Sequence, residues 1–447
     1  MFDIAVFGAG ASGLCASLAA ARLGRHVLLV ERTSLLGGSN TLSLVGPLMG
    51  FTFRGQPIVR GIAQEIVDRL MQRGGSPGHI PDPLGVTDTI TPVDAQLLRQ
   101  VLFDLVRAEP NLTLLLNTWA VHCRMEQGQI RSVHVLGRDG ELDVEAGIYI
   151  DATGDGDLAL SAGVPFTFGR EADHLAQPMT MIFRIRNVDF SAVRRYMQAH
   201  PDQFVLSPNA LSQPYTAISG YFDLVRQARE DGTLHVDRDR ILLFEGVHPG
   251  EALVNTSRVL RLNGTSSRDL TLAEMEGRSQ VDDLLHFLKT RVDGFAGAEL
   301  VETGCAIGVR ETRHFHCMKT MTAEDIIQNS VFPDSVAVCA FPVDIHDPNG
   351  AALTWDHSLP CYDIPFGVMV PEHVQNLLIT GRCVSATHEA SASLRITPTA
   401  MALGQAAGTA AHLALDTQTI PALLDPAGLQ RLLLDTGAIP SRKYVTD

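Results

Sequence analysis

A glycine-rich turn between an apolar strand and an apolar helix, within residues 3–32, constrains the fold more than any other feature. The segment reads DIAVFGAGASGLCASLAAARLGRHVLLVER, and Gly8, Gly10 and Gly13 complete a GxGxxG pattern. The first glycine permits the tight turn, the second lets a pyrophosphate approach the backbone, and the third lets the helix pack on the strand. A second strand ends at Glu31, whose carboxylate can accept hydrogen bonds from ribose hydroxyls. The whole pattern predicts an α/β unit that binds a dinucleotide.

The residues after this unit indicate which dinucleotide is bound. The sequence RTSLLGGSNTLS allows a second close approach of a ligand to the backbone at Gly37 and Gly38. Small polar donors come next, namely Ser39, Asn40 and Thr41. This continuation suits a ligand that extends beyond the pyrophosphate into a flavin, whereas an NAD dehydrogenase would normally proceed to its next strand–helix unit. No second GxGxxG follows a strand, so a separate NADPH site is not expected.

A segment rich in small residues near the C-terminus, 381–415, predicts a second part of the same site. A helix should begin near Thr397, with Pro398 at its first position. Gly404 and Gly408 recur at helical spacing, so this helix can lie very close to another element. The N–H groups expected to be free at its start are those of Thr399, Ala400 and Met401. They would favour the negative charge of a reduced flavin, although an ordinary tightly packed helix has the same spacing.

The central part of the chain has a different character. Thr91, Pro92 and Asp94 predict a helix start, and a strand leads into the glycine-rich sequence DATGDGD at residues 151–157. From residue 165 to about 356 the glycine-turn pattern stops. Since 447 residues exceed what one compact core usually holds, two domains or a large insertion are expected.

Composition limits the possible partners and compartments. The formal net charge of -15 would repel a nucleic acid, although local basic patches could still bind small acids. No apolar run approaches the ~18 residues that a membrane-spanning helix needs, and the first residues lack the features of a signal peptide. The seven scattered cysteines form neither a CxxC pair nor a metal-binding cluster. We therefore expect free thiols, no metal and a cytoplasmic location.

The densest set of cationic and titratable groups is GVRETRHFH, residues 308–316. Arg310 and Arg313 could clamp a carboxylate or polarise a carbonyl group. His314 and His316 could accept or donate a proton. If this stretch is a strand, Arg310, Thr312 and His314 face one side, and Glu311, Arg313 and Phe315 face the other.

Two further points concern the charged residues that could act on a substrate. The stretch 308–316 could instead form a structural ion-pair network around Glu311. ATHEASASLR supplies His388, Glu389 and Arg395 just before the C-terminal helix, where they could act on a substrate or only fix a loop by hydrogen bonds. The catalytic candidates are therefore His388, Arg395, Arg310 and His314.

Three segments together resemble a known family. They are DATGDGDLA, GVRETRH and YDIPFGVMVPEHVQNLLITGRCVSATHEASASLRITPTAMALGQAAGTAA. They are similar to the FAD-dependent oxidoreductases, which are two-dinucleotide-binding-domain flavoproteins with a glutathione-reductase-type fold. That family is distantly similar to the flavoprotein subunits of fumarate reductase and succinate dehydrogenase. The resemblance runs through nearly the whole chain.

This resemblance implies a fold, a cofactor and a set of cofactor-binding positions. The fold is α/β, with a Rossmann-like FAD-binding domain at residues 1–164 and 357–447 and an inserted α+β substrate domain at 165–356. The cofactor positions are Gly8, Gly10, Ala11, Ser12, Gly13, Glu31, Arg32, Gly38, Ser39, Asn40, Thr41, Val121, Ala152, Thr153, Gly154, Asp157, Gly381, Arg382, Thr399, Ala400 and Met401. Distant relatives often have a histidine, covalently linked to FAD, where this chain has Asn40, so non-covalent FAD is expected.

The expected reaction is hydride transfer between a small polar or anionic substrate and the flavin N5, with a proton transferred as well. Dehydrogenation is favoured, and reduction of an activated double bond, as in fumarate reduction, is the alternative. A flavin-binding scaffold or redox sensor is the non-enzymatic alternative. No NAD(P) motif is visible, which leaves oxygen, a quinone or a partner protein as the electron acceptor.

Overall fold

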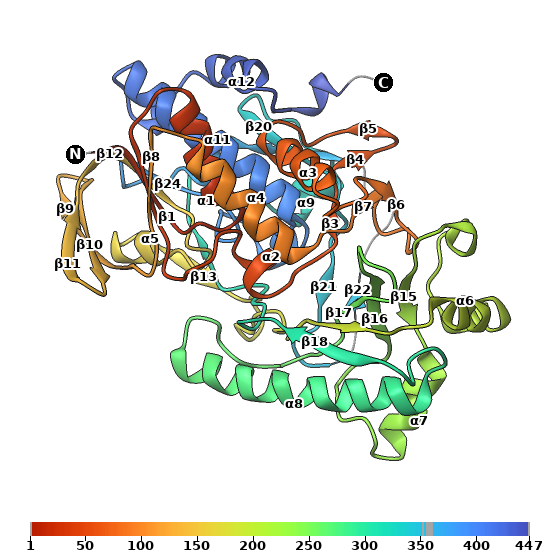
Figure 1. Ribbon diagram of the computed structural model, residues 1–447. Helices are drawn as coiled ribbons and strands as arrows, with labels where there is room; N and C mark the ends of the chain where they lie inside the picture. The colour runs from red at the N-terminus through yellow and green to blue at the C-terminus, as the bar shows by residue number, and fades with distance from the viewer. Residues whose placement is uncertain (1, 351–352, 355–360, 446–447) are drawn as a thin grey trace.

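The computed structural model describes residues 2–350, 353–354 and 361–445. Its central feature is a five-stranded parallel sheet (Figure 1). The strand order is β24 (Leu377–Ile379), β12 (Ala146–Asp151), β1 (Phe2–Phe7), β2 (Val27–Val30) and β8 (Leu112–Leu115). The two ends of the chain therefore join in one sheet. This topology confirms the predicted α/β, Rossmann-like fold.

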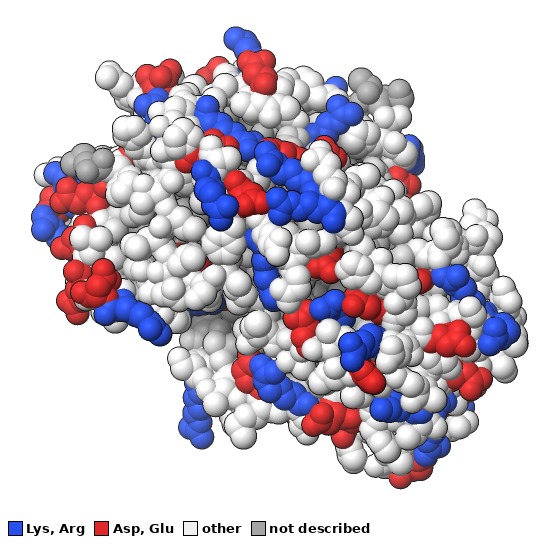
Figure 2. Space-filling view, in the orientation of Figure 1, with Lys and Arg blue, Asp and Glu red and all other residues white. Residues whose placement is uncertain are grey.

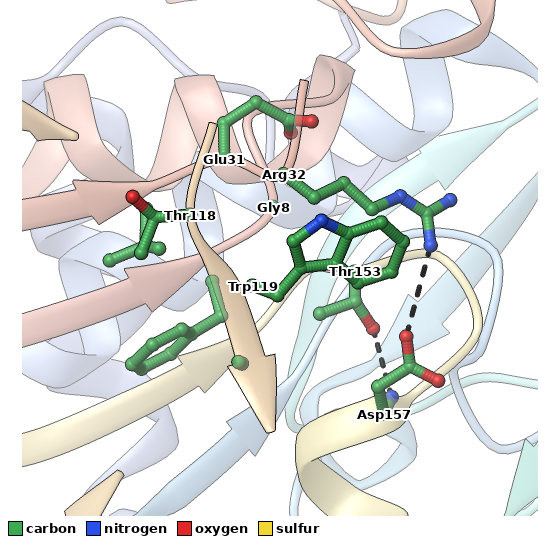
Figure 3. A pocket seen from close by; sticks show the side chains of 10 residues that line it. Gly8, Glu31, Arg32, Thr118, Trp119, Thr153 and Asp157 are labelled. Carbon is green, nitrogen blue, oxygen red and sulfur yellow. Dashed lines mark hydrogen bonds and ion pairs between the residues drawn. The ribbon is translucent and has the colours of Figure 1, made fainter. Parts of the chain in front are cut away.

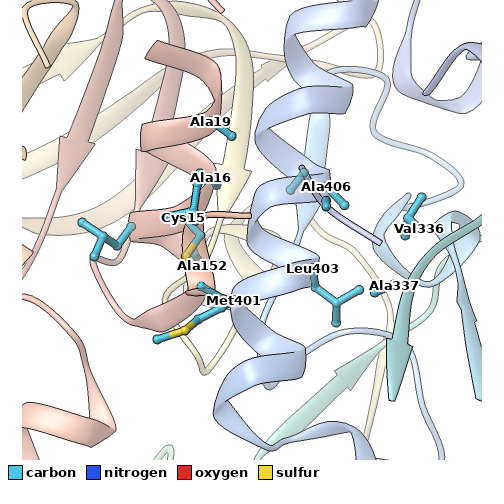
Figure 4. Packing of buried hydrophobic residues seen from close by; sticks show 14 of the residues in the cluster. Cys15, Ala16, Ala19, Ala152, Val336, Ala337, Met401, Leu403 and Ala406 are labelled. Atoms are coloured by element: carbon cyan, nitrogen blue, oxygen red, sulfur yellow. The ribbon is translucent and has the colours of Figure 1, made fainter. Parts of the chain in front are cut away.

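One face of this sheet is covered by helices that pack unusually closely. Helices α1 (Ala11–Arg22) and α11 (Thr397–Asp416) lie side by side, and Figure 4 shows β20 (Ser335–Cys339) on the other side of α11. A Cβ on Gly404 would lie 2.0 Å from the carbonyl oxygen of Ser12, and one on Gly408 would lie 2.1 Å from that of Ala16. The predicted close approach of the C-terminal helix is thus explained by its contact with α1.

The helix predicted to start at Thr91 begins three residues later. Thr91 ends strand β7 (Thr89–Thr91), and helix α4 is Ala95–Arg107. Asp94 is the N-cap, and its side chain accepts a hydrogen bond from the N–H of Leu97 at 2.8 Å. Thr91 pairs with Leu48 in a sheet and does not cap the helix, so the prediction placed the cap three residues too early.

A small antiparallel sheet covers the opposite face of the parallel sheet (Figure 1). Its order is β11 (Gly140–Val144), β10 (Gln129–Gly137) and β9 (Trp119–Glu126). Val133 and Val135 are buried in one cluster with Phe7 and Tyr149 of the parallel sheet. Gly128, with a φ of 77°, makes the turn between β9 and β10.

A second unit has its own sheet and its own core, seen in the lower right of Figure 1. The sheet is antiparallel, in the order β15 (Ala217–Gly220), β16 (Ile241–Glu245), β17 (Ala252–Val254), β14 (Phe183–Arg186) and β18 (Glu299–Thr303). Its helices are α6 (Phe190–Ala199), α7 (Phe222–Glu230) and α8 (Ser267–Arg291). Its buried cluster runs from Met179 to Ile307, and partly buried Val309 packs against it. We call residues 179–309 the inserted unit.

After the inserted unit the chain returns to the parallel-sheet unit. Strand β19 (Arg313–Phe315) pairs with β13 (Phe166–Phe168), and β20 pairs with β23 (Tyr362–Pro365). Met321 and Val336 belong to the cluster that surrounds α1 and α11. The predicted domain limits stay a prediction, and the one between residues 356 and 357 lies outside the described residues. The packing favours an end of the inserted unit near residue 309.

Short elements complete the described chain. They are α2 (Ser39–Leu42), β3 (Leu48–Met49), β4 (Thr52–Phe53), β5 (Gln56–Pro57), α3 (Ile62–Gln72), β6 (Ile80–Pro81), α5 (Asp157–Ser161), α9 (Ala323–Ile327), β21 (Ile345–His346), β22 (Leu353–Thr354), α10 (His388–Leu394) and α12 (Pro426–Asp435). Among the described helices, none has the length and apolar character needed to span a membrane. Acidic and basic side chains are interspersed over the face seen in Figure 2.

Candidate functional site

The N-terminal glycine turn has the geometry of a phosphate cradle. Gly8 has a φ of 96°, and a Cβ there would lie 2.3 Å from the carbonyl oxygen of Ala152. A Cβ on Gly13 would lie 1.8 Å from the carbonyl oxygen of Gly8. Over Gly10, by contrast, the nearest atom to such a Cβ is the Cα of Gly38, at 3.8 Å. Because no side chain caps α1, its first N–H groups can bind an anion in that space.

A hollow opens beside this turn, between β1, β2 and the start of β9 (Figure 3). Its lining residues are Phe7, Gly8, Val30, Glu31, Arg32, Thr118, Trp119, Ala120, Thr153 and Asp157. Five of them were predicted, namely Gly8, Glu31, Arg32, Thr153 and Asp157. The centre of the Trp119 ring lies 5.4 Å from the guanidinium carbon of Arg32. No local sequence pattern had pointed to Trp119. Val121 does not line the hollow, and its side chain is mostly exposed.

Hydrogen bonds hold the Glu31 carboxylate in place at this hollow. Its Oε2 accepts from the N–H of Ala9 at 2.8 Å, and its Oε1 accepts from the N–H and hydroxyl of Thr33 at 2.8 and 2.9 Å. Oε1 already uses both of its lone pairs, whereas Oε2 accepts one hydrogen bond and can still accept another from a ribose hydroxyl. The position of Glu31 therefore fits its predicted role.

The other predicted cofactor residues gather around the same sheet edge. They lie at the start of α1 (Gly10, Ala11, Ser12, Gly13), at α2 (Gly38, Ser39, Asn40, Thr41), after β12 (Ala152, Gly154), after β24 (Gly381, Arg382) and in α11 (Thr399, Ala400, Met401). The Ser12 and Thr380 hydroxyls are 2.7 Å apart, and Asn40 Nδ2 donates to Thr397 Oγ1 at 3.0 Å. Both contacts join the N-terminal and C-terminal parts of the site. Contact of these residues with the cofactor stays a prediction.

The start of α11 differs from the prediction in its free donors. The N–H of Ala400 donates to the carbonyl oxygen of Ile396 at 3.0 Å, so it is not free, and Met401 is one residue further into the helix. Of the three residues predicted, only Thr399 keeps a free N–H. The buried hydroxyl of Thr399 has no hydrogen-bond partner in the part of the chain that the structure describes. An unpartnered buried hydroxyl fits a site that a polar ligand completes.

The stretch 308–316 is a strand only near its C-terminal end, so the alternation of faces expected of a strand does not extend over it. The described strand is Arg313–Phe315, and the residues before it are irregular. Glu311 and His314, predicted on opposite faces, contact each other: His314 Nε2 lies 2.9 Å from Glu311 Oε1. His388 Nδ1 lies 2.8 Å from the same oxygen. The N–H of Gln177 donates to Glu311 Oε2 at 2.8 Å.

These contacts fix the charge of Glu311. Burial raises the pKa of its carboxyl, but the hydrogen bonds from His314 and His388 outweigh burial and lower the pKa to about 2. An ionised carboxylate only accepts hydrogen bonds, so the imidazole nitrogens that face it are N–H donors. When the His388 ring is neutral, its Nε2 therefore carries the free lone pair. Glu311 thus holds His388 in the tautomer that a general base needs.

Arg310 and Arg395 lie close to the boundary between the parallel-sheet unit and the inserted unit. We call this boundary the seam. Arg310 Nη1 donates to the carbonyl oxygen of Pro178 and to Thr180 Oγ1, both at 2.6 Å. Arg395 Nη2 donates to Gln177 Oε1 at 3.3 Å and lies 3.4 Å from Asp344 Oδ2. Burial lowers the pKa of both guanidinium groups, and the nearby charge of Arg395 lowers that of Arg310 further. Predicted residues from two distant segments are thus brought together with Gln177 and Asp344, which the sequence did not indicate.

Arg313 and His316 lie elsewhere. Arg313 Nη1 donates to the carbonyl oxygen of Asp155 at 2.8 Å and to Asp157 Oδ1 at 3.0 Å, on the side of the dinucleotide hollow. Asp155 also accepts from Arg382 at 2.7 Å. His316 is exposed. Arg313 therefore joins residues 308–316 to the parallel-sheet unit through Asp155 and Asp157, whereas the structural reading of this stretch expected a network around Glu311.

The fold and the site together define a flavoprotein of the dinucleotide-binding α/β class. The chain belongs to the family described as FAD dependent oxidoreductase, whose model matches residues 3–433. FAD is accordingly its cofactor, and it is an oxidoreductase. The glycine cradle, the hollow and the unpartnered Thr399 hydroxyl fit that cofactor. Among the described residues, no group of three or more His, Cys, Asp and Glu side chains could hold a metal ion.

Several solved structures have a distantly similar shape. A geranylgeranyl bacteriochlorophyll reductase-like protein from Thermoplasma acidophilum is 11% identical over 97% of this chain and 83% of its own, with a TM-score of 0.46. A p-nitrophenol 4-monooxygenase from Pseudomonas putida DLL-E4 is 11% identical over 97% and 82%, with a TM-score of 0.48. These values assign no reaction to this chain. No curated protein was found with a similar sequence.

Proposed function

We propose that this oxidoreductase dehydrogenates a small anionic substrate at the seam between the parallel-sheet unit and the inserted unit. The observation that carries this proposal is the convergence of Arg310 and Arg395 close to the Glu311–His388 pair. Gln177 joins the two sets, because its N–H donates to Glu311 and its side-chain oxygen accepts from Arg395. An anion-binding group and a proton-accepting group therefore share one buried region.

The proposed roles follow from the contacts of each side chain. FAD, when bound, exchanges a hydride with a substrate carbon. Arg395 and Arg310 hold a carboxylate of the substrate, and burial strengthens this attraction. His388 takes the proton from the substrate hydroxyl at Nε2, and Glu311 stabilises the imidazolium that forms. The same groups would serve the alternative reaction, reduction of an activated double bond, in which one carbon receives a hydride from the flavin and His388 gives a proton to the other.

The proposal extends to the cofactor linkage and the compartment. Asn40 lacks the ring nitrogen through which a histidine could link to FAD, and its side-chain amide already donates to Val45 and Thr397, so we propose non-covalent FAD. The cysteines of the described chain are all free, which suits a reducing compartment such as the cytoplasm.

An anaerobic screen tests this function. The FAD-loaded protein would be mixed with small 2-hydroxy acids and amino acids, and with the matched amides and alcohols that lack the carboxylate. We expect the acids to bleach the flavin at least tenfold faster than their neutral analogues, and Arg395→Gln to raise the half-saturating concentration of the acids. Bleaching by neutral apolar compounds alone, with no effect of Arg395→Gln, would contradict the proposal.

A further inference from the structure

Arg395, Gln177 and Asp344 form one hydrogen-bonded group at the seam. Arg395 Nη2 donates to Gln177 Oε1 at 3.3 Å, to the carbonyl oxygen of Asp344 at 3.3 Å and to Asp344 Oδ2 at 3.4 Å. The Arg395 and Asp344 side chains are 16% and 13% exposed, whereas Gln177 is 2% exposed. The group is therefore reached from solvent at the arginine and the aspartate and is enclosed at the glutamine.

Three atoms of this group lack a partner. Within the described chain, no hydrogen-bond partner is present for Gln177 Nε2, Arg395 Nε or Asp344 Oδ1. Each belongs to an amide, guanidinium or carboxylate group that takes part in the contacts of Arg395 Nη2, so covalent geometry keeps the three atoms close together. Unpaired buried polar atoms are costly in a folded protein. A ligand that pairs all three must offer an acceptor for the two donors and a donor for the carboxylate oxygen.

Asp344 can only accept hydrogen bonds. Burial raises the pKa of its carboxyl, but His346, Arg395 and Arg310 outweigh burial and hold the pKa well below its usual range. Its Oδ2 is already used, since it lies 3.2 Å from His346 Nε2 and 3.4 Å from Arg395 Nη2. The Oδ1 of the ionised group therefore requires an O–H or N–H group.

The positive charge of Arg395 is already opposed by carboxylates. Burial lowers the pKa of its guanidinium group, and the charges of Asp344 and Glu311 act in the opposite direction. The unmet requirement is thus for hydrogen bonds on both sides of the Arg395–Asp344 pair. A substrate carboxylate can accept from Arg395 and Gln177, but Asp344 would repel it, so Asp344 Oδ1 needs a different group of the substrate.

We propose that Asp344 selects substrates that carry a hydroxyl or an ammonium group beside the carboxylate, in addition to the hydroxyl that is oxidised. This inference rests on the proposed function, in which Arg395 holds the carboxylate and His388 takes the proton of the reacting hydroxyl. The substrate class is then small dihydroxy acids or amino-hydroxy acids. The two groups share the same chemistry, which is a hydrogen bond donated to a buried carboxylate.

Three acids of similar size test this selectivity. Lactate, glycerate and isoserine share a carboxylate and a 2-hydroxyl, and their third carbon carries no donor, a hydroxyl or an ammonium group. Each enantiomer is titrated by calorimetry into FAD-loaded protein whose flavin has been reduced beforehand, so that the acids bind without reacting. We expect glycerate or isoserine to bind about tenfold or more tightly than lactate, and the tighter of the two identifies the group. Lactate binding as tightly as both would overturn the inference.

Asp344→Asn tests whether this carboxylate makes the distinction. An amide that keeps its oxygen towards Arg395 turns its NH2 group towards the ligand, where it cannot accept from an ammonium group. The affinity ratio of isoserine to lactate should fall to about one, and that of glycerate to lactate should decrease. Asp416→Asn is the matched control, because it removes a carboxylate at a side chain that is 65% exposed and pairs with Arg25. It should keep the ratios of the unchanged protein. Unchanged ratios in Asp344→Asn, or an equal loss in both variants, would overturn the inference.

The proposed function and this selectivity fail in different ways. Tight binding of glycerate or isoserine, with no bleaching of the oxidised flavin by any of the three acids, would contradict the proposed function alone. Bleaching by all three acids at equal half-saturating concentrations would contradict the selectivity of Asp344 alone.

Discussion

At the scale of single residues, Glu311 determines the state of its neighbours. Its carboxylate is fully buried and accepts hydrogen bonds from His314, His388 and the backbone of Gln177. A carboxyl group whose pKa falls on folding, here from 4.5 to about 2, stabilises the folded state above pH 4.5. That contribution is lost as the pH falls from 4.5 towards 2.

Glu311→Gln tests this account through stability. The folded protein should lose about 3 kcal/mol of its free energy of unfolding at pH 7, as the pKa shift implies. Denaturant unfolding at several pH values measures the difference between the two proteins. This difference should shrink as the pH falls below 4.5, because the Glu311 carboxyl is then protonated in the unfolded state while it stays ionised in the folded state. A difference that stays constant from pH 7 to pH 3.5 would show that the pKa of Glu311 is not lowered by folding.

Asn40 gives a second prediction at this scale. Its side chain is 2% exposed and donates to Val45 and Thr397, so it holds α2 against the start of α11 without a reactive ring nitrogen. Acid precipitation of the purified yellow protein should release all of its FAD into the supernatant. A yellow pellet that resists washing would contradict non-covalent binding.

Sequence reasoning found some site residues and missed others for a physical reason. His388 and Arg395 lie just before a recognisable helix, and Arg310 and His314 lie in a visibly charged stretch. Gln177, Thr180 and Asp344, which contact Arg310 or Arg395, lie outside the regular helices and strands, with no motif around them. Their proximity depends on how the inserted unit packs against the parallel-sheet unit, which no local pattern encodes.

At the scale of elements, the contact between α1 and α11 supports the cofactor site. Gly404→Ala would place a methyl group 2.0 Å from the Ser12 carbonyl oxygen, which is backbone and cannot move aside. We expect a loss of about 3 kcal/mol in the free energy of unfolding, together with weaker FAD retention, because α1 carries the glycine cradle. Denaturant midpoints and the flavin content of the purified protein measure both effects.

Gly428→Ala in α12 is the matched control. There a new Cβ would lie 3.2 Å from the exposed Asp425 side chain, which can shift. This variant should be neutral or slightly stabilising, as expected for alanine in place of a helical glycine. Equal effects of the two substitutions would show that the helix contact is not tight.

The elements themselves were predicted best where local and long-range preferences agree. The second strand, predicted to end at Glu31, is β2, which ends at Val30, and the helix predicted to begin near Thr397 is α11. The stretch 308–316 was predicted less well, since only three residues find a partner strand in β13. Glu311 and Thr312, just before that strand, are buried, and Glu311 binds two histidines. Alternation of charged residues alone could not show this.

At the scale of the whole molecule, the proposed substrate site lies where two separately packed units meet. The parallel-sheet unit contains the dinucleotide hollow, His388 and Arg395, and Thr180 of the inserted unit accepts a hydrogen bond from Arg310. The sequence predicted an insertion because the glycine turns stop at residue 165. It could not show that residues 313–339 return to the first unit, because that return depends on strand pairing over long distances.

Anaerobic stopped-flow measurement of flavin reduction by His388→Ala tests the central claim most directly. The substrate is the acid that bleaches the unchanged protein fastest, and the control is His373→Ala, whose side chain is 80% exposed. If His388 takes the substrate proton, the rate of reduction should fall by about 10²–10⁴ in His388→Ala and stay unchanged in the control. A His388→Ala protein that is folded, binds FAD and is reduced at the unchanged rate would contradict the account.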